Sequence, residues 1–475
     1  MKINPLKRNH WLAVLFFCIV SFVSFSQNCD CESEFISVKS FIEENYAGFN
    51  DKVSNVNRNT YSKLENDLLQ QAKSASSDNY CYFTIQTLLN YFNDGHLRLI
   101  VNPKKTNNSA TETISLSSET IAELHAKSAT DIEGIYTTIS KSYEIALIKN
   151  QTPFRDYVGV ITATNTKEWE VGQVKLELKH IEGDNYNGIY YLKDHTPEVK
   201  SYILKSGQYR IDNFIKNGTT TLINVEETEP FFKNENSTKV VFYEDVNDST
   251  AYLRIKSFDQ RFFKKVISVV KKNEKKIKSK PYLIIDVRYN GGGSDFVYEP
   301  LLPFIYTNPI KSIGVDVLST PENILSWQRV IDENPKLPEN VKNRLQYVIS
   351  QMKENPNQLV NIVNDTTETM QEIYEYPKKI AVLIDKDCAS STEEFLLTAK
   401  QSQKVVLMGE PTAGVLDYSN MRIKNLECSP FILGYSTTRS RRIPENAIDE
   451  TGITPNYTID FDKRWIDNVL KTITK

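Results

Sequence analysis

Residues 281–293 read PYLIIDVRYNGGG, an apolar run that ends in three consecutive glycines. The residues from Leu283 to Val287 are apolar except for Asp286, which predicts a buried strand that runs into a glycine turn. Glycines let the backbone approach a ligand closely, although a flexible turn explains the same residues equally well. No Gly-Lys-Ser/Thr follows, and no GxGxxG opens the next helix, so a phosphate-binding loop is excluded.

Strand and helix patterns alternate on both sides of this run. The stretch FFKKVISVVKKNEKKI before it has helical spacing, and KKIAVLIDKD and VVLMGEPTAG after it are further buried strands. This order predicts an α/β core with largely parallel strand pairing over residues 240–475. Residues 314–375 interrupt the core with a polar, helical segment that is too long for an ordinary connection, and we interpret it as a lid over a site.

Two regions of different character precede the core. Residues 27–105 repeat apolar residues at intervals of three and four, which predicts an N-terminal helical segment. Residues 106–239 begin with a polar linker and continue in short alternating runs broken by Asn, Gly and Asp, which predicts an inserted small antiparallel β domain. A chain of 475 residues has room for these parts as separate domains.

The charges of the chain are nearly balanced. The 57 Lys and Arg residues face 60 Asp and Glu, a net charge of -3, and no long block of like charge occurs. The sequence therefore shows no nucleic-acid-binding footprint, and a neutral or mixed-charge substrate fits better.

The N-terminus predicts export. Residues 1–26 combine basic residues, a short apolar run and small residues ahead of Gln27, which is typical of a cleaved signal peptide and leaves no stable membrane span. An uncleaved anchor is the alternative, and lipid attachment at Cys29 is a minor option because no apolar residue of the lipidation type precedes it. In a periplasmic or extracellular protein disulfides form, and we expect Cys81 to pair with Cys29 or Cys31.

The stretch CASSTEEFLL, residues 388–397, places Ser390 and Ser391 directly before a helical apolar run. Each serine stands three residues before a glutamate, so a capping box explains the stretch without catalysis. The functional alternative is a nucleophile, because the free N–H groups and the positive dipole end of a helix N-terminus suit an oxyanion.

A serine nucleophile needs a base, and the histidines are the first candidates. Four follow the predicted signal peptide: His96, His125, His180 and His195. Only His96, in NDGHL, stands at a turn from helix to strand, where positioned catalytic groups are common. The sequence contains no HExxH motif and no paired CxxC motif, so neither a metal site nor a cofactor is expected.

Five motifs in order resemble the tail-specific (C-terminal processing) serine peptidases and their tricorn-core and interphotoreceptor retinoid-binding relatives. The motifs are AYLRIKSF, PYLIIDVRYNGGG, IAVLIDKDCASSTEEF, VVLMGEPTAG and IDETGITPN, and NDGHL adds to them. The resemblance implies an α/β core of the ClpP/crotonase-like type. It also implies that Ser390 is the nucleophile, with Glu393 as the helix glutamate. The Ser391 amide and an amide at Gly292 or Gly293 would form the oxyanion hole.

The two branches of this family differ in the base. The processing branch has a lysine directly after GEPTFG, but Val415 follows GEPTAG here, so the resemblance excludes a Ser-Lys pair at that position. The tricorn-like branch takes a histidine from an early DGH-type motif, which is similar to His96, and an acidic residue ahead of its G-V-x-P-D motif. In IDETGITPN that residue is Asp449, and Glu450 stays open because a one-residue loop shift would exchange them. Asn456 stands where the family has Asp, and no PDZ-like carboxylate-binding loop is recognisable.

The sequence thus predicts a secreted or periplasmic serine-type endopeptidase that acts on a peptide or protein substrate through a Ser-His-acid arrangement. The alternative is a non-catalytic binding protein for a peptide or hydrophobic ligand on the same fold, because fold alone does not settle function. A third reading makes the β domain an adhesion module. The sequence does not predict an oligomeric state.

Overall fold

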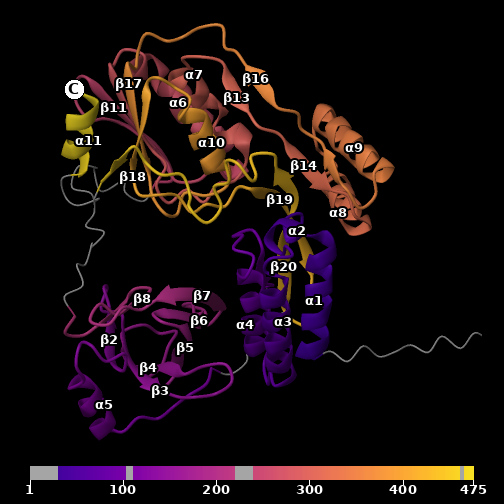
Figure 1. Cartoon of the computed structure of the whole chain (residues 1–475). Helices are drawn as coiled ribbons and strands as arrows, with labels where there is room; N and C mark the ends of the chain where they lie inside the picture. Colours follow the sequence, from indigo (N-terminus) through magenta and orange to yellow (C-terminus); the bar gives the residue numbers. More distant parts are fainter. Residues whose placement is uncertain (1–29, 103–110, 220–238, 460–464, 475) are drawn as a thin grey trace, which may run out of the picture.

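The computed structural model describes residues 30–102, 111–219, 239–459 and 465–474 (Figure 1). Its central sheet has six strands in the order β10-β11-β12-β17-β18-β21. The pair β10 and β11 is antiparallel, and all other neighbours in this sheet are parallel, as predicted. The strands are β10 (Val241–Asp245), β11 (Thr250–Ile255), β12 (Tyr282–Asp286), β17 (Lys379–Ile384), β18 (Val405–Gly409) and β21 (Tyr457–Thr458).

Helices cover both faces of the central sheet. Figure 1 shows α6 and α10 on one side of the sheet and α11 on the other. Leu283 and Ile285 of β12 pack in one apolar cluster with α6 and α10, whereas Ile284 packs in another with α11. Burial on both faces explains why β12 is a continuous apolar run rather than an alternating one. The helices around this sheet are η1 (Gln260–Phe262), α6 (Phe263–Ile277), η2 (Asp295–Val297), η3 (Glu299–Leu301), α7 (Leu302–Ile305), α10 (Ser391–Ala399) and α11 (Trp465–Ile473).

A second sheet pairs a strand from the N-terminal part of the chain with strands from its C-terminal part. Its central strand β20 (Phe431–Ser440) pairs along its length with β19 (Tyr418–Asn425), and its other edge pairs with β1 (Arg98–Val101) and β14 (Val315–Leu318). The N-terminal helices lie around β20 (Figure 1), and their apolar residues pack with those of β19 and β20 in one cluster. These helices are α1 (Cys31–Asn45), α2 (Phe49–Lys52), α3 (Arg58–Lys73) and α4 (Asp78–Asn90). The turn between α4 and β1 is thereby held beside the C-terminal part of the chain.

The segment interpreted as a lid joins this second sheet. Its strand β15 (Leu359–Asn361) extends the sheet beside β14, and α8 (Pro321–Asp332) and α9 (Glu339–Glu354) build a small core on them that includes Trp327. Two further short strands, β13 (Ile310–Ser312) and β16 (Thr366–Glu368), pair with each other. The segment is fixed to α1 because the Thr320 hydroxyl donates to Asn45 Oδ1 at 2.6 Å.

The region between the N-terminal helices and the core is an antiparallel sheet of eight strands in the order β7-β6-β5-β4-β3-β2-β9-β8. Alternating apolar side chains form its core around Trp169. Its elements are α5 (Ser118–His125), β2 (Gly134–Thr138), β3 (Tyr143–Lys149), β4 (Tyr157–Thr164), β5 (Val174–Glu182), β6 (Asn185–Tyr191), β7 (Pro197–Ile203), β8 (Arg210–Ile211) and β9 (Phe214–Lys216). The strands predicted for this region are therefore present.

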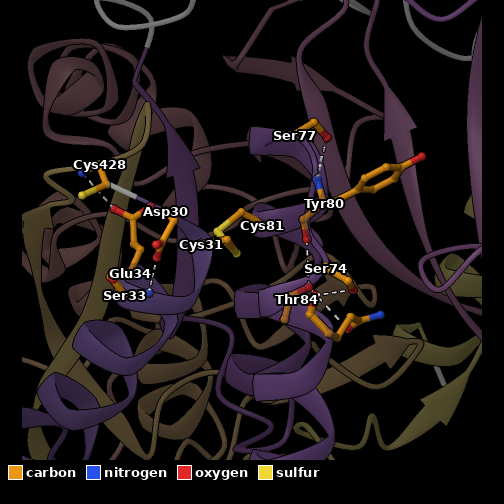
Figure 2. Close-up of a disulfide and its surroundings, with 11 residues drawn as sticks. Asp30, Cys31, Ser33, Glu34, Ser74, Ser77, Tyr80, Cys81, Thr84 and Cys428 are labelled. Atoms are coloured by element: carbon orange, nitrogen blue, oxygen red, sulfur yellow. Dashed lines mark hydrogen bonds between the residues drawn. A yellow bond between two sulfur atoms is a disulfide. The ribbon is translucent and has the colours of Figure 1, made fainter. Parts of the chain in front are cut away.

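A disulfide between Cys31 and Cys81 ties α1 to α4 (Figure 2). The predicted pairing of Cys81 is confirmed, with Cys31 as the partner. Cys428 is also disulfide-bonded, and Cys388 is a free, buried thiol.

The predicted signal peptide, its cleavage point and the alternative lipid site at Cys29 lie outside the described residues. Among the helices that the structure describes, none has the length and hydropathy to cross a membrane.

Candidate active site

Ser390 stands between β17 and α10 in an unusual backbone conformation. Its φ of 55° and ψ of -125° lie in a region that L-residues rarely adopt. Such a conformation costs on the order of 1–3 kcal/mol and persists only where the surroundings enforce it. The Ser390 N–H donates to the Val415 carbonyl and to Glu393 Oε2, each at 3.1 Å. These bonds hold the backbone of the serine at the start of α10.

Glu393 connects the start of α10 to the GEPTAG loop. Its carboxylate is fully buried. Besides the Ser390 amide, it accepts from the Thr412 hydroxyl at 2.6 Å and from the amides of Gly414 and Val415 at 2.8 Å. The glutamate half of the predicted capping box therefore forms, and it also fixes the loop that follows β18.

His96 reaches Ser390 from the turn between α4 and β1. Its Nε2 lies 3.3 Å from Ser390 Oγ, and its Nδ1 lies 2.9 Å from the Tyr418 carbonyl oxygen. A carbonyl only accepts, so Nδ1 carries the proton and Nε2 is left to accept from the serine hydroxyl. The Tyr418 side chain is anchored in turn, since its hydroxyl donates to Asp51 Oδ2 at 3.0 Å.

Asp94 is the carboxylate beside this histidine. Its Oδ1 lies 3.6 Å from His96 Nδ1 and accepts from the His96 amide at 2.8 Å, while its Oδ2 accepts from the Ser436 hydroxyl at 3.0 Å. Burial lowers the pKa of His96, but the hydrogen bond and charge of Asp94 oppose it, and the pKa of His96 is raised above its usual value. The arrangement stabilises an imidazolium.

The two acidic residues predicted as orienters lie in different surroundings. Asp449 is buried, and its Oδ1 accepts from the amides of Leu416 and Asp417 at 2.8 and 2.9 Å. Burial, together with the charges of Asp94 and Asp417, raises the pKa of Asp449 to about 7 against the pull of these amides. The other oxygen, Oδ2, is buried and has no hydrogen-bond partner in the described part of the chain.

Glu450, by contrast, is exposed and pairs with Lys52 at 3.2 Å. In the part of the chain that the structure describes, neither Asp449 nor Glu450 hydrogen-bonds to His96. The imidazole instead bonds to the Tyr418 carbonyl and contacts the Asp94 carboxylate. Asp449 still acts on His96 through its charge, which raises the histidine pKa.

The glycine loop approaches the serine closely. A Cβ on Gly292, where φ is +95°, would lie 2.6 Å from the Ala389 carbonyl oxygen and 2.9 Å from Ser390 Cβ, so only glycine fits. However, the Gly292 amide donates to Asn290 Oδ1 at 3.0 Å and the Gly293 amide donates to Ser391 Oγ at 2.8 Å. The two glycine amides predicted as oxyanion donors therefore already donate hydrogen bonds to other groups of the protein. The Ser391 amide has no acceptor among the described residues.

Val415 directly follows GEPTAG, the position at which the processing branch of the resembled family has its lysine. A Cβ on Gly95 would lie 2.8 Å from Val415 Cγ2, so this side chain packs against the turn that carries His96. The described residues also contain no group of three or more His, Cys, Asp or Glu side chains arranged to hold a metal ion.

Sequence reasoning missed two partners of His96. Asp94 lies within the quoted NDGHL motif and could have been weighed as a near neighbour of the histidine. Tyr418 acts through its backbone carbonyl, which no residue type signals. The structure brings Ser390, His96, Ser391 and the glycine loop together, and leaves Glu450 at the surface.

Comparison with known proteins gives a family match for the core. Residues 249–459 match the model described as Peptidase family S41, a range that includes Ser390 and Asp449 but not His96. No curated protein matches the chain.

Among solved structures, mature CPAF is 12% identical with a TM-score of 0.51, over 94% of this chain and 96% of that chain. Mature CPAF complexed with lactacystin is 12% identical with a TM-score of 0.50, over 94% of this chain and 98% of that chain. At this identity the likeness shows a shared fold.

Proposed function

We propose that the chain hydrolyses peptide bonds with Ser390 as nucleophile and His96 as base, a proposal supported by the match of residues 249–459 to the model of Peptidase family S41. The observation that carries the proposal is the 3.3 Å contact between His96 Nε2 and Ser390 Oγ. A nucleophile and a base within hydrogen-bond reach, with the base oriented by a third group, are the requirements for acyl transfer by serine.

In the proposed mechanism, Ser390 Oγ attacks the carbonyl carbon of the scissile peptide bond and His96 Nε2 takes its proton. The resulting imidazolium keeps its Nδ1–H on the Tyr418 carbonyl, 2.9 Å away, and is stabilised by the Asp94 carboxylate at 3.6 Å. His96 then gives the proton to the leaving amine, and water releases the acyl group by the reverse sequence. We assign the orienting role to Asp94, while Asp449 contributes through its charge and Glu450 has no direct part.

The Ser391 amide is the proposed oxyanion donor because it points from the helix N-terminus and has no acceptor among the described residues. A second donor from Gly292 or Gly293 requires that one amide leave Asn290 Oδ1 or Ser391 Oγ when substrate binds. This rearrangement is part of the proposal.

Because the Gly292 and Gly293 amides already donate hydrogen bonds within the protein, a second candidate function is favoured. With a single free donor, the same site could hold a peptide or a hydrophobic ligand without cleaving it. We therefore keep a non-catalytic binding protein as the alternative.

We further propose that the core is of the ClpP/crotonase-like type and that the enzyme is an endopeptidase exported to the periplasm or the cell exterior. The signal-like residues 1–26 and the Cys31–Cys81 disulfide support export, because disulfides persist in oxidising compartments.

Labelling with a fluorescent fluorophosphonate tests the site. We expect the purified protein to be labelled, Ser390→Ala to be unlabelled, and His96→Ala to be labelled at least about 100-fold more slowly, since general-base catalysis contributes about 10²- to 10⁴-fold. His125→Ala, at the exposed end of α5, is the matched control and should be labelled like wild type. Labelling of His96→Ala at the wild-type rate would remove His96 as the base, and an unlabelled wild type would favour the binding protein.

A further inference from the structure

Tyr418 contacts the N-terminal helical region at two points. Its carbonyl oxygen accepts from His96 Nδ1 at 2.9 Å, and its side-chain hydroxyl donates to Asp51 Oδ2 of α2 at 3.0 Å. The mechanism proposed above uses only the first contact. Whether the carbonyl stays in place for His96 depends on what fixes the rest of this residue.

The strand pairing of β19 leaves the Tyr418 carbonyl free to face His96. Tyr418 is the first residue of β19 and lies opposite Arg439 of β20. The Ser440 amide donates to the Asp417 carbonyl at 2.8 Å, so the next pair along the strands, Tyr418 and Arg439, is a non-hydrogen-bonded pair. In such a pair the backbone groups of each residue point away from the other strand. The pairing with β20 therefore does not bond this carbonyl directly.

The Asp51 carboxylate holds the side chains of both members of this pair. Besides the Tyr418 hydroxyl, it accepts from Arg439 Nε at 2.6 Å through Oδ2 and from Arg439 Nη2 at 3.3 Å through Oδ1. Hydrogen bonds to a charged carboxylate are about twice as strong as neutral ones, and two bonds from one guanidinium fix its orientation. Asp51 thus fastens the start of β19 and its partner on β20 to α2.

The Tyr418 ring is enclosed by the segment that leads into α2. The residue is 2% exposed, and a Cβ on Gly48 would lie 2.8 Å from Tyr418 Cε1, so glycine leaves room for the ring. The centre of the Tyr46 ring lies 5.5 Å from that of Tyr418, and the Lys52 ammonium lies 5.6 Å from it. Burial and the charge of Asp51 raise the pKa of Tyr418, so its hydroxyl stays a donor.

We propose that Asp51 is a positioning residue for the base, because it holds Tyr418 by the side chain and thereby keeps the Tyr418 carbonyl on His96 Nδ1. The inference rests on the proposed peptidase function and adds a residue to it. Asp51 touches neither the nucleophile nor the base. It acts by keeping the imidazole in the tautomer and orientation that present Nε2 to Ser390.

Fluorophosphonate labelling of the full-length Tyr418→Phe variant tests this inference, because the change removes one hydroxyl and no charge. We expect labelling about 3- to 10-fold slower than in wild type, the scale of one hydrogen bond. Tyr61→Phe is the matched control. Tyr61 is 1% exposed, lies in the same apolar cluster and donates its hydroxyl to Glu43 of α1 at 3.2 Å rather than to α2. This control should be labelled like wild type.

Variants of Asp51 test the other side of the contact. Asp51→Ala should slow labelling by a similar factor, whereas Asp51→Asn, which keeps an oxygen acceptor for the Tyr418 hydroxyl, should be closer to wild type. Both Asp51→Ala and Tyr418→Phe break the same contact. Their combination should therefore be labelled no more slowly than the slower single variant, since residues that act through one contact are not additive.

The acid limb of the labelling rate against pH separates positioning from a general loss of structure. Burial lowers the pKa of His96, whereas Asp94, the Tyr418 carbonyl and the charge of Asp449 raise it. A weaker bond to the carbonyl lowers this pKa, so Tyr418→Phe and Asp51→Ala should move the acid limb to lower pH. Tyr61→Phe should leave the limb in place.

Proton NMR gives a second readout that needs no catalysis. The Nδ1 proton of His96 is identified as the downfield imidazole resonance that is absent from His96→Ala. It should move upfield in Tyr418→Phe and Asp51→Ala and stay in place in Tyr61→Phe.

The outcomes distinguish this inference from the peptidase proposal. Tyr418→Phe with an unmoved acid limb and an unmoved Nδ1 resonance overturns the inference, whether its labelling is slowed or not, and leaves the peptidase proposal intact. An unlabelled wild type overturns the peptidase proposal, and the Nδ1 resonance then still decides whether Asp51 holds the histidine. Should Asp51→Ala not fold, Tyr418→Phe decides alone.

Discussion

At the scale of single residues, two buried carboxylates near His96 differ in how their oxygens are hydrogen-bonded. Asp94 accepts two hydrogen bonds and lies 3.6 Å from the imidazole, whereas Asp449 leaves one buried oxygen without a partner among the described residues. The sequence contained both residues, but their partners from distant parts of the chain are Ser436 of β20 for Asp94 and the amides of Leu416 and Asp417, in the loop before β19, for Asp449. Spacing along the chain therefore could not tell which carboxylate contacts the base.

Replacement of Asp94 by Asn should affect catalysis through the histidine. Because Tyr418 still fixes the tautomer, we expect kcat/KM to fall by roughly 10- to 100-fold rather than the ~10⁴-fold seen where the tautomer is lost. Asp94 raises the pKa of His96, so its removal should also shift the acid limb of the pH–rate profile to lower pH. A purely structural role for Asp94 would lower the rate without moving that limb. Glu450→Gln, at the surface, should change neither.

Asp449 should make the stability of the fold depend on pH. Its pKa is about 7 in the folded protein and near 3.8 when the carboxyl is solvated, so between these values the native state binds the extra proton. The stabilisation from this group is complete below pH 3.8 and is lost as the pH rises through 7. In urea unfolding at pH 5 and pH 8, Asp449→Asn should show a smaller decrease in unfolding free energy than wild type. An equal decrease in both proteins would contradict this prediction.

At the scale of elements, the start of α10 combines a helix cap with the proposed nucleophile. The two readings of CASSTEEFLL, a capping box and a nucleophile, prove compatible, since Glu393 caps the helix while the Ser390 hydroxyl lies near His96. Local motifs predict this element well because its strand, its turn and its helix are contiguous. The engagement of the glycine amides could not be predicted, because it depends on the side-chain rotamers of Asn290 and Ser391.

Glu393→Ala should both destabilise the core and disorder the serine. The change leaves three donors without an acceptor, the Thr412 hydroxyl and the amides of Gly414 and Val415, because the Ser390 amide keeps the Val415 carbonyl. We expect a loss of at least about 3 kcal/mol, since each unsatisfied group costs roughly 1–3 kcal/mol. Urea unfolding measures the loss, and fluorophosphonate labelling of the folded fraction should be slower than in wild type. The neighbouring Glu394→Ala, which loses a single ion pair with Arg442 at 3.5 Å, is the control. A similar loss of stability in both variants would contradict the assigned role.

At the scale of the whole molecule, the strand pairing of the second sheet could not be predicted from the sequence. The parallel pairing of the core strands follows from the alternation of strand and helix, but β1 pairs with β20 more than 300 residues away, and no local pattern encodes that pairing. Likewise, the 314–375 segment was recognised as an insertion, whereas its attachment to this sheet through β14 and β15 depends on tertiary contacts.

The disulfide should stabilise the N-terminal helices that pack on this sheet. It links residues separated by 50 positions, and a closed loop of that size contributes about 4 kcal/mol through the unfolded chain. The double variant Cys31→Ala/Cys81→Ala should lower the unfolding free energy by up to that amount and increase hydrogen exchange in α1 and α4 more than in β12. Unchanged exchange in these helices would show that packing alone holds them. Cys388→Ala, which removes the free thiol, is the comparison.

The dependence of His96 on β19 and β20 has a consequence for biosynthesis. The ring is held by the Tyr418 carbonyl, and its neighbour Asp94 is held by Ser436, so both supports are translated after Ser390, the proposed nucleophile. A nascent chain that has emerged as far as α10 contains serine and histidine but not the framework that joins them. If Ser390 and His96 act as proposed, the site becomes competent only after β19 and β20 have been synthesised.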